Sequence, residues 1–273
     1  MNNTILFPKN LVEAKKILSK KEKVVPIAGG TSVLLNFSQN TKLLDLEPLK
    51  LDYIKYSNNR LKIGAMTVVN ELLDSHLIKK YCNGIIKDAV LTIASTPNRN
   101  LITVGGNIVG IHPWSVFPGL LMLLEGKVVT AKKRVIEAEK LFSSVPKNVL
   151  EKDIVTEVQF PDVNKHILSY WKKFSITETD YPIVSVGIIC ENKNDLVKKI
   201  RIVAVGLTLF PQRFKEVEEM LNNKKLNKEL VDKVLEKIKN VARVSNDIRV
   251  SIEYKKEVLT VLVKEFLDKF VCK

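Results

Sequence analysis

The amino-acid sequence predicts an α+β fold in two parts, a mixed N-terminal domain and a C-terminal domain built of a sheet and helices. Short apolar strands alternate with helical stretches up to about residue 50, and β-rich pieces predominate from 51 to 160. Beyond Pro161 three strands come first and helical periodicity follows. Strands followed by runs of helices are typical of α+β proteins. We therefore expect an N-terminal domain over residues 1–160, with subdomains of about 1–50 and 51–160, and a C-terminal domain over 161–273.

The first 50 residues indicate a small α/β subdomain. Asn10 is a suitable helix N-cap, Glu13 follows at the capping-box position, and apolar residues recur at helical spacing after them. This pattern predicts an amphipathic helix over 10–20. Apolar runs at 24–27 and 42–46 predict two strands, and the first of them runs directly into a glycine pair.

The elements that follow are predicted from local patterns. Two strands are expected around Asn58-Asn59, a dipeptide suited to a tight hairpin turn. Helices are expected at 68–75 and 83–94, and three short strands after Gly126. The C-terminal domain should then contain strands at 166–176, 183–192 and 199–209, with a turn at 191–195, and helices at about 216–223, 226–242 and 251–271.

Composition argues against several classes of protein. No apolar run approaches the roughly 20 residues of a membrane-spanning helix, and the N-terminus has no secretory signal, so we expect a cytoplasmic protein without membrane insertion. Cys82, Cys190 and Cys272 are far apart and form no C-x-x-C motif, which argues against a metal or cluster site in this chain. The net charge is +14, but the lysines that account for it are spread over both domains. We therefore expect solvated surfaces and no nucleic-acid partner.

Two glycine pairs lie in stretches that suggest a ligand. Gly29-Gly30 follows a predicted strand and precedes two hydroxyl side chains, and Gly105-Gly106 lies in a stretch with little helical or strand rhythm. Glycines let a ligand approach the main chain, and successive backbone N–H groups can form a nest for an anion such as a pyrophosphate. Each pair alone could equally be an ordinary turn. Neither matches the Rossmann or P-loop glycine signature.

Taken together, the motifs resemble those of the FAD-binding subunits of the molybdenum hydroxylases, which include xanthine dehydrogenase and carbon monoxide dehydrogenase. The stretches that carry the resemblance are "PIAGGTSVL", "LKIGAMT" and "IASTPNRNLITVGGNI", in this order and spacing. Later, "VAVGLTLFPQR" and "VSNDIRVSIEYKKEVLTVLV" resemble the family's glycine strand before P-x-R and its terminal S-D-x-R-x-S-x-x-Y-R signature. The resemblance covers nearly the whole chain. It implies an FAD-binding domain of the vanillyl-alcohol-oxidase (PCMH) type with two subdomains, followed by a three-stranded antiparallel sheet with helices.

The resemblance also implies which residues bind the cofactor, and it implies no catalytic side chain because the flavin carries the electrons. The residues that would cradle the pyrophosphate are Ala28, Gly29, Gly30, Thr31 and Ser32. Those that would hold the pyrophosphate and the ribityl side of the flavin are Thr103, Gly105, Gly106 and Asn107. Those that would lie near the isoalloxazine ring and a nicotinamide pocket are Lys173 and Asp180.

Some positions depart from the family pattern. Val116 stands where a carboxylate is expected, and Thr177 stands where the family usually has an arginine. His112 and Trp114 are unusual in their loop. The residues themselves leave open whether Trp114 packs in the core or stacks on a ring.

The function that the resemblance implies is electron transfer in a larger complex. The partners would be a small subunit with two [2Fe-2S] clusters and a large molybdopterin subunit. Electrons would pass from the clusters through FAD to NAD or another acceptor. Two other functions stay open: a stand-alone FAD oxidoreductase of the same fold, and a non-enzymatic module whose basic surface binds a polyanion.

Overall fold

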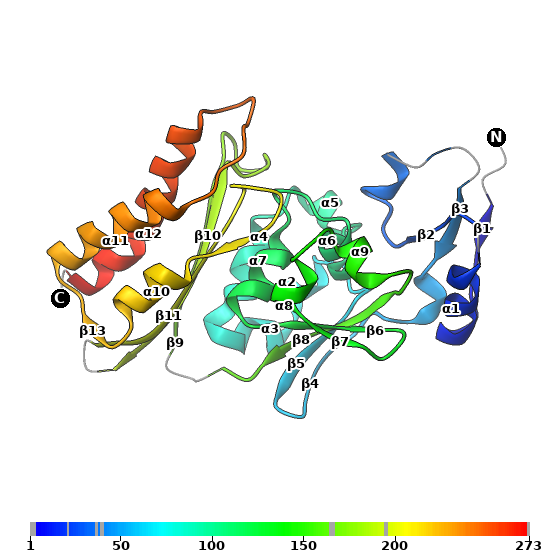
Figure 1. Cartoon of the computed structure of the whole chain (residues 1–273). Helices are drawn as coiled ribbons and strands as arrows, with labels where there is room; N and C mark the ends of the chain where they lie inside the picture. The colour runs from blue at the N-terminus through cyan, green and yellow to red at the C-terminus, as the bar shows by residue number, and fades with distance from the viewer. Residues whose placement is uncertain are drawn as a thin grey trace. The chain divides into compact units, whose positions relative to one another are not determined.

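The computed structural model describes residues 4–20, 22–35, 38, 41–163, 167–193 and 196–271. The chain divides into two compact units (Figure 1). The first unit comprises the chain up to Leu77 together with Ser95–Ile111 and Glu125–Asp162. The second comprises Ile78–Ala94, His112–Leu124 and the chain from Val163 onward. Cys272 and the last two residues of the expected 191–195 turn lie outside the described residues.

The first unit begins with a small parallel sheet. Its strand order is β1 (Ile5–Leu6), β3 (Lys42–Asp45), β2 (Val24–Ile27). Helix α1 (Leu11–Ser19) joins β1 to β2, as the apolar spacing predicts. The Asn10 side chain caps this helix by accepting from the N–H groups of Val12 and Glu13, both at 3.0 Å. The Glu13 carboxylate accepts from the N–H of Lys9 at 2.7 Å, one residue before the partner that a capping box would use.

The first unit also contains a five-stranded antiparallel sheet and several short helices. Its order is β4 (Ile54–Ser57), β5 (Arg60–Gly64), β8 (Val155–Pro161), β6 (Lys127–Thr130), β7 (Val135–Glu137). Asn58 and Asn59 both have φ of 53°, which is the backbone of the expected two-residue hairpin turn. The short helices of this unit are α2 (Glu71–Asp74), α5 (Thr96–Arg99), α6 (Val104–Val109), α8 (Ala138–Leu141) and α9 (Pro146–Leu150).

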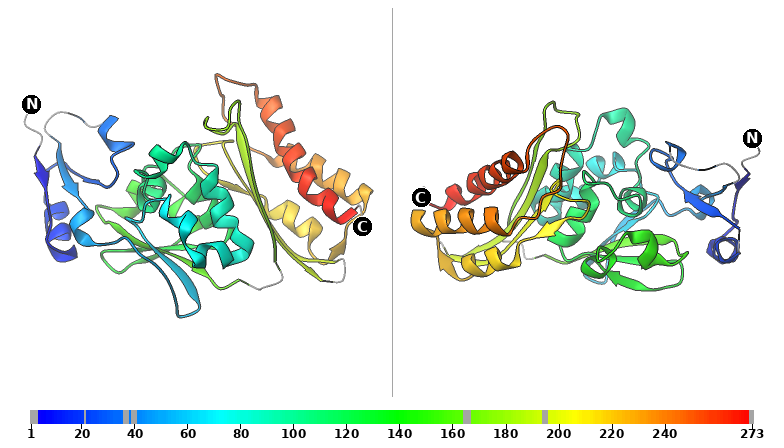
Figure 2. Two further views of the ribbon diagram at one scale, coloured as in Figure 1. Left: turned by 180° about the vertical axis from the view of Figure 1, so that it is seen from behind. Right: turned by 45° about the horizontal axis from the view of Figure 1, so that its top comes forward.

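The second unit is built on three long antiparallel strands. These are β9 (Ile167–Phe174), β10 (Val184–Lys193) and β11 (Leu196–Val205), and the two-residue strands β12 (Gln212–Arg213) and β13 (Lys224–Lys225) both pair with β11. Figure 2 shows three helices along one face of this sheet: α10 (Lys215–Leu221), α11 (Lys228–Val241) and α12 (Ile252–Val271). A large apolar core fills the space between this face and these helices.

The opposite face of the same sheet contacts α4 (Ile85–Leu91) and α7 (Val116–Leu123). Glycine is required at two places there. A Cβ on Gly119 would lie 3.0 Å from the Trp171 ring, and one on Gly187 would lie 2.7 Å from it. The indole therefore fills the space between the strand and the helix. Val116, which stands where the family has a carboxylate, is buried at the start of α7.

Several short helices were not expected from the sequence, and α5, α6 and α7 are among them because they lie in or beside the stretch that lacked visible rhythm. Helix α6 reads Val-Gly-Gly-Asn-Ile-Val, and two glycines give it a poor intrinsic helix propensity. A six-residue helix of this composition depends on capping and tertiary contacts, which periodicity does not reveal. None of the helices in the described part of the chain is both long and apolar enough to cross a membrane.

Candidate functional site

The segments that carry the two glycine pairs contact one another in the first unit, although the pairs themselves are 76 positions apart in sequence. A Cβ added to Gly29 would come within 1.6 Å of the carbonyl oxygen of Leu101. A Cβ added to Gly110, just after the second pair, would lie 3.8 Å from the Ser32 hydroxyl. The turn after β2 therefore packs directly on the segment that leads into α6. Gly29 is needed at this contact because no side chain of any size fits.

The turn from Ala28 to Ser32 leaves backbone donors open. Gly30 has φ of +72°, a conformation that glycine adopts without strain, and its carbonyl accepts from the N–H of Leu34 at 3.2 Å. Within the described part of the chain, no protein group accepts a hydrogen bond from the N–H of Gly29, Gly30 or Thr31. Gly29 and Thr31 are also exposed. Successive unpaired N–H groups around a left-handed residue can bind an anion.

The second pair is arranged differently, because its backbone donors are already used. Thr103 is the N-cap of α6, and its hydroxyl oxygen accepts from the N–H of Gly106 at 3.1 Å. The N–H of Gly105 donates to the carbonyl of Ala65 at 2.8 Å, and that of Asn107 donates to the carbonyl of Thr103 at 2.9 Å. What this pair can offer a ligand is the half-buried Asn107 side chain and the exposed, side-chain-free surface of Gly106.

Close backbone packing connects the three N-terminal motifs of the family pattern. A Cβ on Gly105 would lie 2.9 Å from both the Cβ and the carbonyl oxygen of Ala65, which belongs to the I-G-A motif. Gly64 in the same motif is equally confined, because its added Cβ would lie 2.1 Å from the carbonyl oxygen of Leu51. The I-G-A motif thus supports α6, and the residues before α6 support the turn at Gly29.

Lys173 and Asp180, the two predicted site residues of the second unit, are brought together by the loop between β9 and β10. The Lys173 ammonium donates to the carbonyl oxygens of Glu178 and, at 3.2 Å, of Asp180. The Asp180 carboxylate accepts from the N–H of Thr177 at 3.1 Å. Burial lowers the pKa of Lys173, and the nearby negative charges of Glu178 and Asp180 oppose that effect. Thr177, at the position where the family has an arginine, therefore contributes its backbone to this loop.

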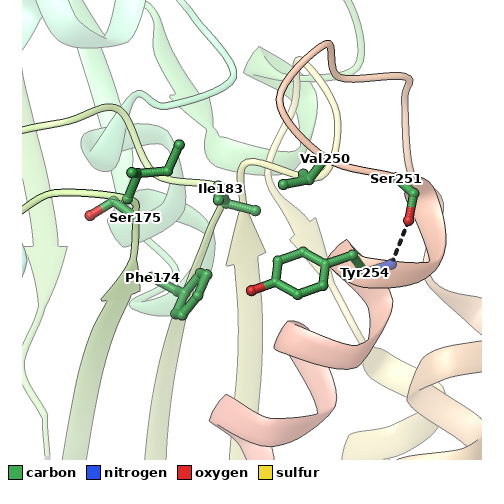
Figure 3. A pocket seen from close by; sticks show the side chains of 7 residues that line it. Phe174, Ser175, Ile183, Val250, Ser251 and Tyr254 are labelled. Atoms are coloured by element: carbon green, nitrogen blue, oxygen red, sulfur yellow. Dashed lines mark hydrogen bonds between the residues drawn. The ribbon is translucent and has the colours of Figure 1, made fainter.

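Aromatic side chains stack beside the same loop. The Trp114 ring lies between His112, at a centroid distance of 4.9 Å, and Tyr181, at 4.1 Å. Trp114 therefore packs against other side chains of the protein, and it does so by ring stacking. A pocket of about 530 Å³ lies at the base of the loop, and Figure 3 shows the rings of Phe174 and Tyr254 among its walls.

Sequence reasoning missed the residues that anchor this loop from the C-terminal signature. Arg249 donates to the carbonyl oxygens of Tyr181 and Pro182, and its guanidinium also pairs with Asp247. Hydrogen bonds from Arg249, and then from Lys255, hold the pKa of Asp247 well below its usual range, although partial burial opposes them. The signal in the sequence was the S-D-x-R-x-S-x-x-Y-R resemblance, which marks these positions without indicating what they touch.

Comparison with known proteins finds two family models that together match nearly the whole chain. Residues 1–163 match the FAD binding domain in molybdopterin dehydrogenase, and residues 169–270 match the CO dehydrogenase flavoprotein C-terminal domain. The chain is 29% identical to the glyceraldehyde dehydrogenase medium chain of Sulfolobus acidocaldarius, over 93% of this chain and 92% of the relative. It is 25% identical to the carbon monoxide dehydrogenase medium chain of Hydrogenophaga pseudoflava, over 96% of this chain and 94% of the relative.

Solved structures share the fold. Carbon monoxide dehydrogenase from Hydrogenophaga pseudoflava superposes with a TM-score of 0.90 at 24% identity, over 97% of this chain and 96% of the other. Quinoline 2-oxidoreductase from Pseudomonas putida 86 gives 0.89 at 18% identity, over 98% and 96%. The fold is thus the expected two-subdomain FAD-binding type with a C-terminal antiparallel sheet. With the FAD-binding domain matching more than half of its length, this chain belongs to the FAD-binding medium subunits of the molybdenum hydroxylases, of the carbon monoxide dehydrogenase medium-chain type.

Proposed function

We propose that this chain is the FAD-binding electron-transfer subunit of a molybdenum hydroxylase complex. The observation that carries the proposal is the contact between the two glycine motifs, where three neighbouring N–H groups of the turn from Ala28 to Ser32 have no acceptor among the described residues. A dinucleotide cofactor needs such donors because its pyrophosphate is anionic and lies close to the main chain. The residues present therefore fit FAD.

The proposal gives each predicted residue a role. The N–H groups of Gly29, Gly30 and Thr31 bind the pyrophosphate, and the Thr31 and Ser32 hydroxyls add donors. Asn107 contributes its amide, and Gly106 lets the cofactor approach the start of α6, which Thr103 and Gly105 hold in place. When bound, FAD supplies the redox chemistry, since a flavin can exchange electrons singly or in pairs.

The second unit contributes charge to the same function. In the proposal Lys173 and Asp180 lie beside the isoalloxazine ring, held together by the carbonyl contact between them. NAD is one candidate electron acceptor. A nicotinamide nucleotide would miss the forked guanidinium of the family arginine, because Thr177 offers only a hydroxyl and a backbone already bonded to Asp180.

The partners in this proposal are an iron–sulfur subunit with two [2Fe-2S] clusters and a molybdopterin subunit. The similarity to proteins named as medium chains of glyceraldehyde and carbon monoxide dehydrogenases supports this assembly. The described part of this chain holds no group of three or more potential metal-ligating side chains, so metal centres would have to be supplied by other subunits.

The test is purification of the full chain, with a visible absorption spectrum and FAD quantified after denaturation. We expect close to one FAD for each chain, and we expect iron and molybdenum to co-purify from the native host. A chain that folds but takes up no FAD would overturn the proposal. A homo-oligomer that turns over substrate with FAD alone would favour a stand-alone flavin oxidoreductase instead.

A further inference from the structure

The outer part of the loop between β9 and β10 is bonded within itself, because Thr177 and Asp180 bond to one another and the Ser175 hydroxyl donates to the carbonyl of Thr177 at 2.7 Å. Residues 175–183 connect the two strands, and all the side chains from Ile176 to Tyr181 are exposed. The base of the loop is closed by the N–H of Ile183, which donates to the carbonyl of Phe174 at 2.8 Å. Ordering each backbone residue costs roughly 1–2 kcal/mol, so an exposed loop of this length needs contacts from outside.

Arg249 supplies such contacts through both edges of its guanidinium. On one edge, Nη1 donates to the carbonyl of Tyr181 at 2.9 Å and Nη2 donates to that of Pro182 at 3.2 Å. On the other edge, Nε and Nη2 bond the two carboxylate oxygens of Asp247, at 3.0 and 2.8 Å. A planar fork can bind a carboxylate and two consecutive carbonyls at once, whereas a lysine ammonium cannot.

Lys255 connects this pair to the sheet. Its side chain is only 4% exposed, and its ammonium lies 2.9 Å both from the Asp247 carboxylate and from the carbonyl oxygen of Gly206, at the end of β11. A buried ammonium is costly unless it is fully paired, and here it has two partners. Gly206 in turn has φ of +94° and donates its N–H to the carbonyl of Pro113 at 2.9 Å.

Gly206 also connects the 175–183 loop to the segment that contains Pro113 and Trp114. A Cβ on Gly206 would lie 2.6 Å from the carbonyl oxygen of Ile183, so the end of β11 supports the end of the 175–183 loop directly. Trp114, one residue after Pro113, stacks on Tyr181. The guanidinium, the buried ammonium and the stack thus act on the same short segment, Tyr181 to Ile183.

We propose that Arg249, oriented by Asp247 and Lys255, is a positioning residue that fixes the 175–183 loop and thereby the place of Lys173 and Asp180. The inference rests on the proposed function, in which those two residues lie beside the flavin. Arg249 acts through the loop backbone, and it neither touches the cofactor nor takes part in chemistry. The Lys173 ammonium and the Asp180 carboxylate then stay at fixed positions relative to the isoalloxazine ring.

The experiment compares hydrogen–deuterium exchange of the 175–183 peptide in the full FAD-loaded chain for wild type, Arg249→Gln, Arg249→Lys and Lys255→Met. Arg243→Gln is the matched control, because Arg243 lies in the same segment between α11 and α12 and, among the described residues, its hydrogen bonds to Gln212 are made by its backbone alone. The peptide from α11, which contains none of the substituted residues, reports on global stability in every sample. The flavin reduction potential of each protein is the second readout.

We expect exchange of the loop amides to rise about tenfold or more in Arg249→Gln, which corresponds to the loss of one charge-assisted hydrogen bond. Arg249→Lys should give an intermediate rise, and it serves as the interpretable variant if Arg249→Gln does not fold. The flavin potential should shift in both Arg249 variants, with FAD content and α11 exchange unchanged. Arg243→Gln should resemble wild type.

Unchanged loop exchange in both Arg249 variants would show that the guanidinium does not hold the loop, and would overturn the inference. Faster exchange with an unchanged flavin potential would overturn the positioning role, because the loop would then move without consequence for the cofactor. A wild-type chain without FAD would refute the proposed function, whereas the exchange comparison would still support or reject the anchoring of the loop.

Discussion

The two glycine pairs look almost alike in the sequence, yet glycine is needed in them for different physical reasons. Gly29-Gly30 follows the end of β2, and its backbone N–H groups have no acceptor among the described residues, whereas Gly105-Gly106 lies in the first turn of α6 and its N–H groups bond within the protein. In each pair the first glycine packs on another backbone segment. The second glycines differ, because Gly30 has a left-handed φ and Gly106 has an exposed surface. This difference predicts that first glycines maintain the fold and second glycines admit the ligand.

The largest effect is expected for Gly29→Ala. The new Cβ would lie 1.6 Å from the Leu101 carbonyl oxygen, so two backbone segments would have to separate. We expect a loss of about 3 kcal/mol or more in the stability of the first unit, at the upper end of overpacking effects. Hydrogen exchange of β2 and β5 amides measures it. An exchange pattern like that of wild type would show that the two motifs are not in contact.

A smaller loss of stability is expected for Gly105→Ala. Its Cβ would lie 2.9 Å from the Cβ and the carbonyl oxygen of Ala65, which can be relieved by a small shift. We expect a cost of about 1–3 kcal/mol, measured by the same exchange experiment. Adding Ala65→Gly removes one of the two close contacts and should restore part of the stability. If the double variant is no more stable than Gly105→Ala, the Ala65 side chain is not the obstacle.

The second glycine of the same pair should affect binding more than folding. Gly106→Val introduces a branched side chain on an exposed surface where the nearest atom outside its immediate neighbours is the Thr103 hydroxyl oxygen, at 2.8 Å. We expect FAD affinity to fall by at least tenfold, or about 1.4 kcal/mol, with most of the fold retained. Titration of the apoprotein with FAD tests this. Stoichiometric FAD in the variant would mean that the cofactor does not approach Gly106.

The smallest effects are expected for alanine substitutions of Thr103 and Thr31, and the two should differ in kind. Thr103→Ala removes an N-cap and should reduce stability by about 1 kcal/mol, and Thr103→Ser should restore it because the hydroxyl returns. Thr31→Ala should leave stability unchanged and weaken FAD binding, since Thr31 has no protein partner in the described part of the chain. Thermal unfolding and FAD titration of all three variants compare the roles. Equal loss of stability in the two alanine variants would contradict the distinction between the motifs.

Much of the fold followed from the sequence because its signals are local. The cap at Asn10, the hairpin at Asn58-Asn59 and the three long C-terminal strands each depend on residues close together in the chain. Helices α10 to α12 were expected for the same reason, since an apolar stripe at helical spacing is visible within one segment. The family followed from glycine motifs whose order and spacing are also properties of the sequence alone.

Tertiary structure decided what those motifs do. Helix α6 forms although its glycines disfavour it, because Thr103 caps it and Ala65 supports it from the turn after β5. The contact of Gly29 with Leu101 and the bonds from Arg249 to Tyr181 join residues about 70 positions apart. Propensity and periodicity describe only a residue's near neighbours in the chain. Which backbone donors stay open for a ligand therefore depends on contacts that exist only once the chain is folded.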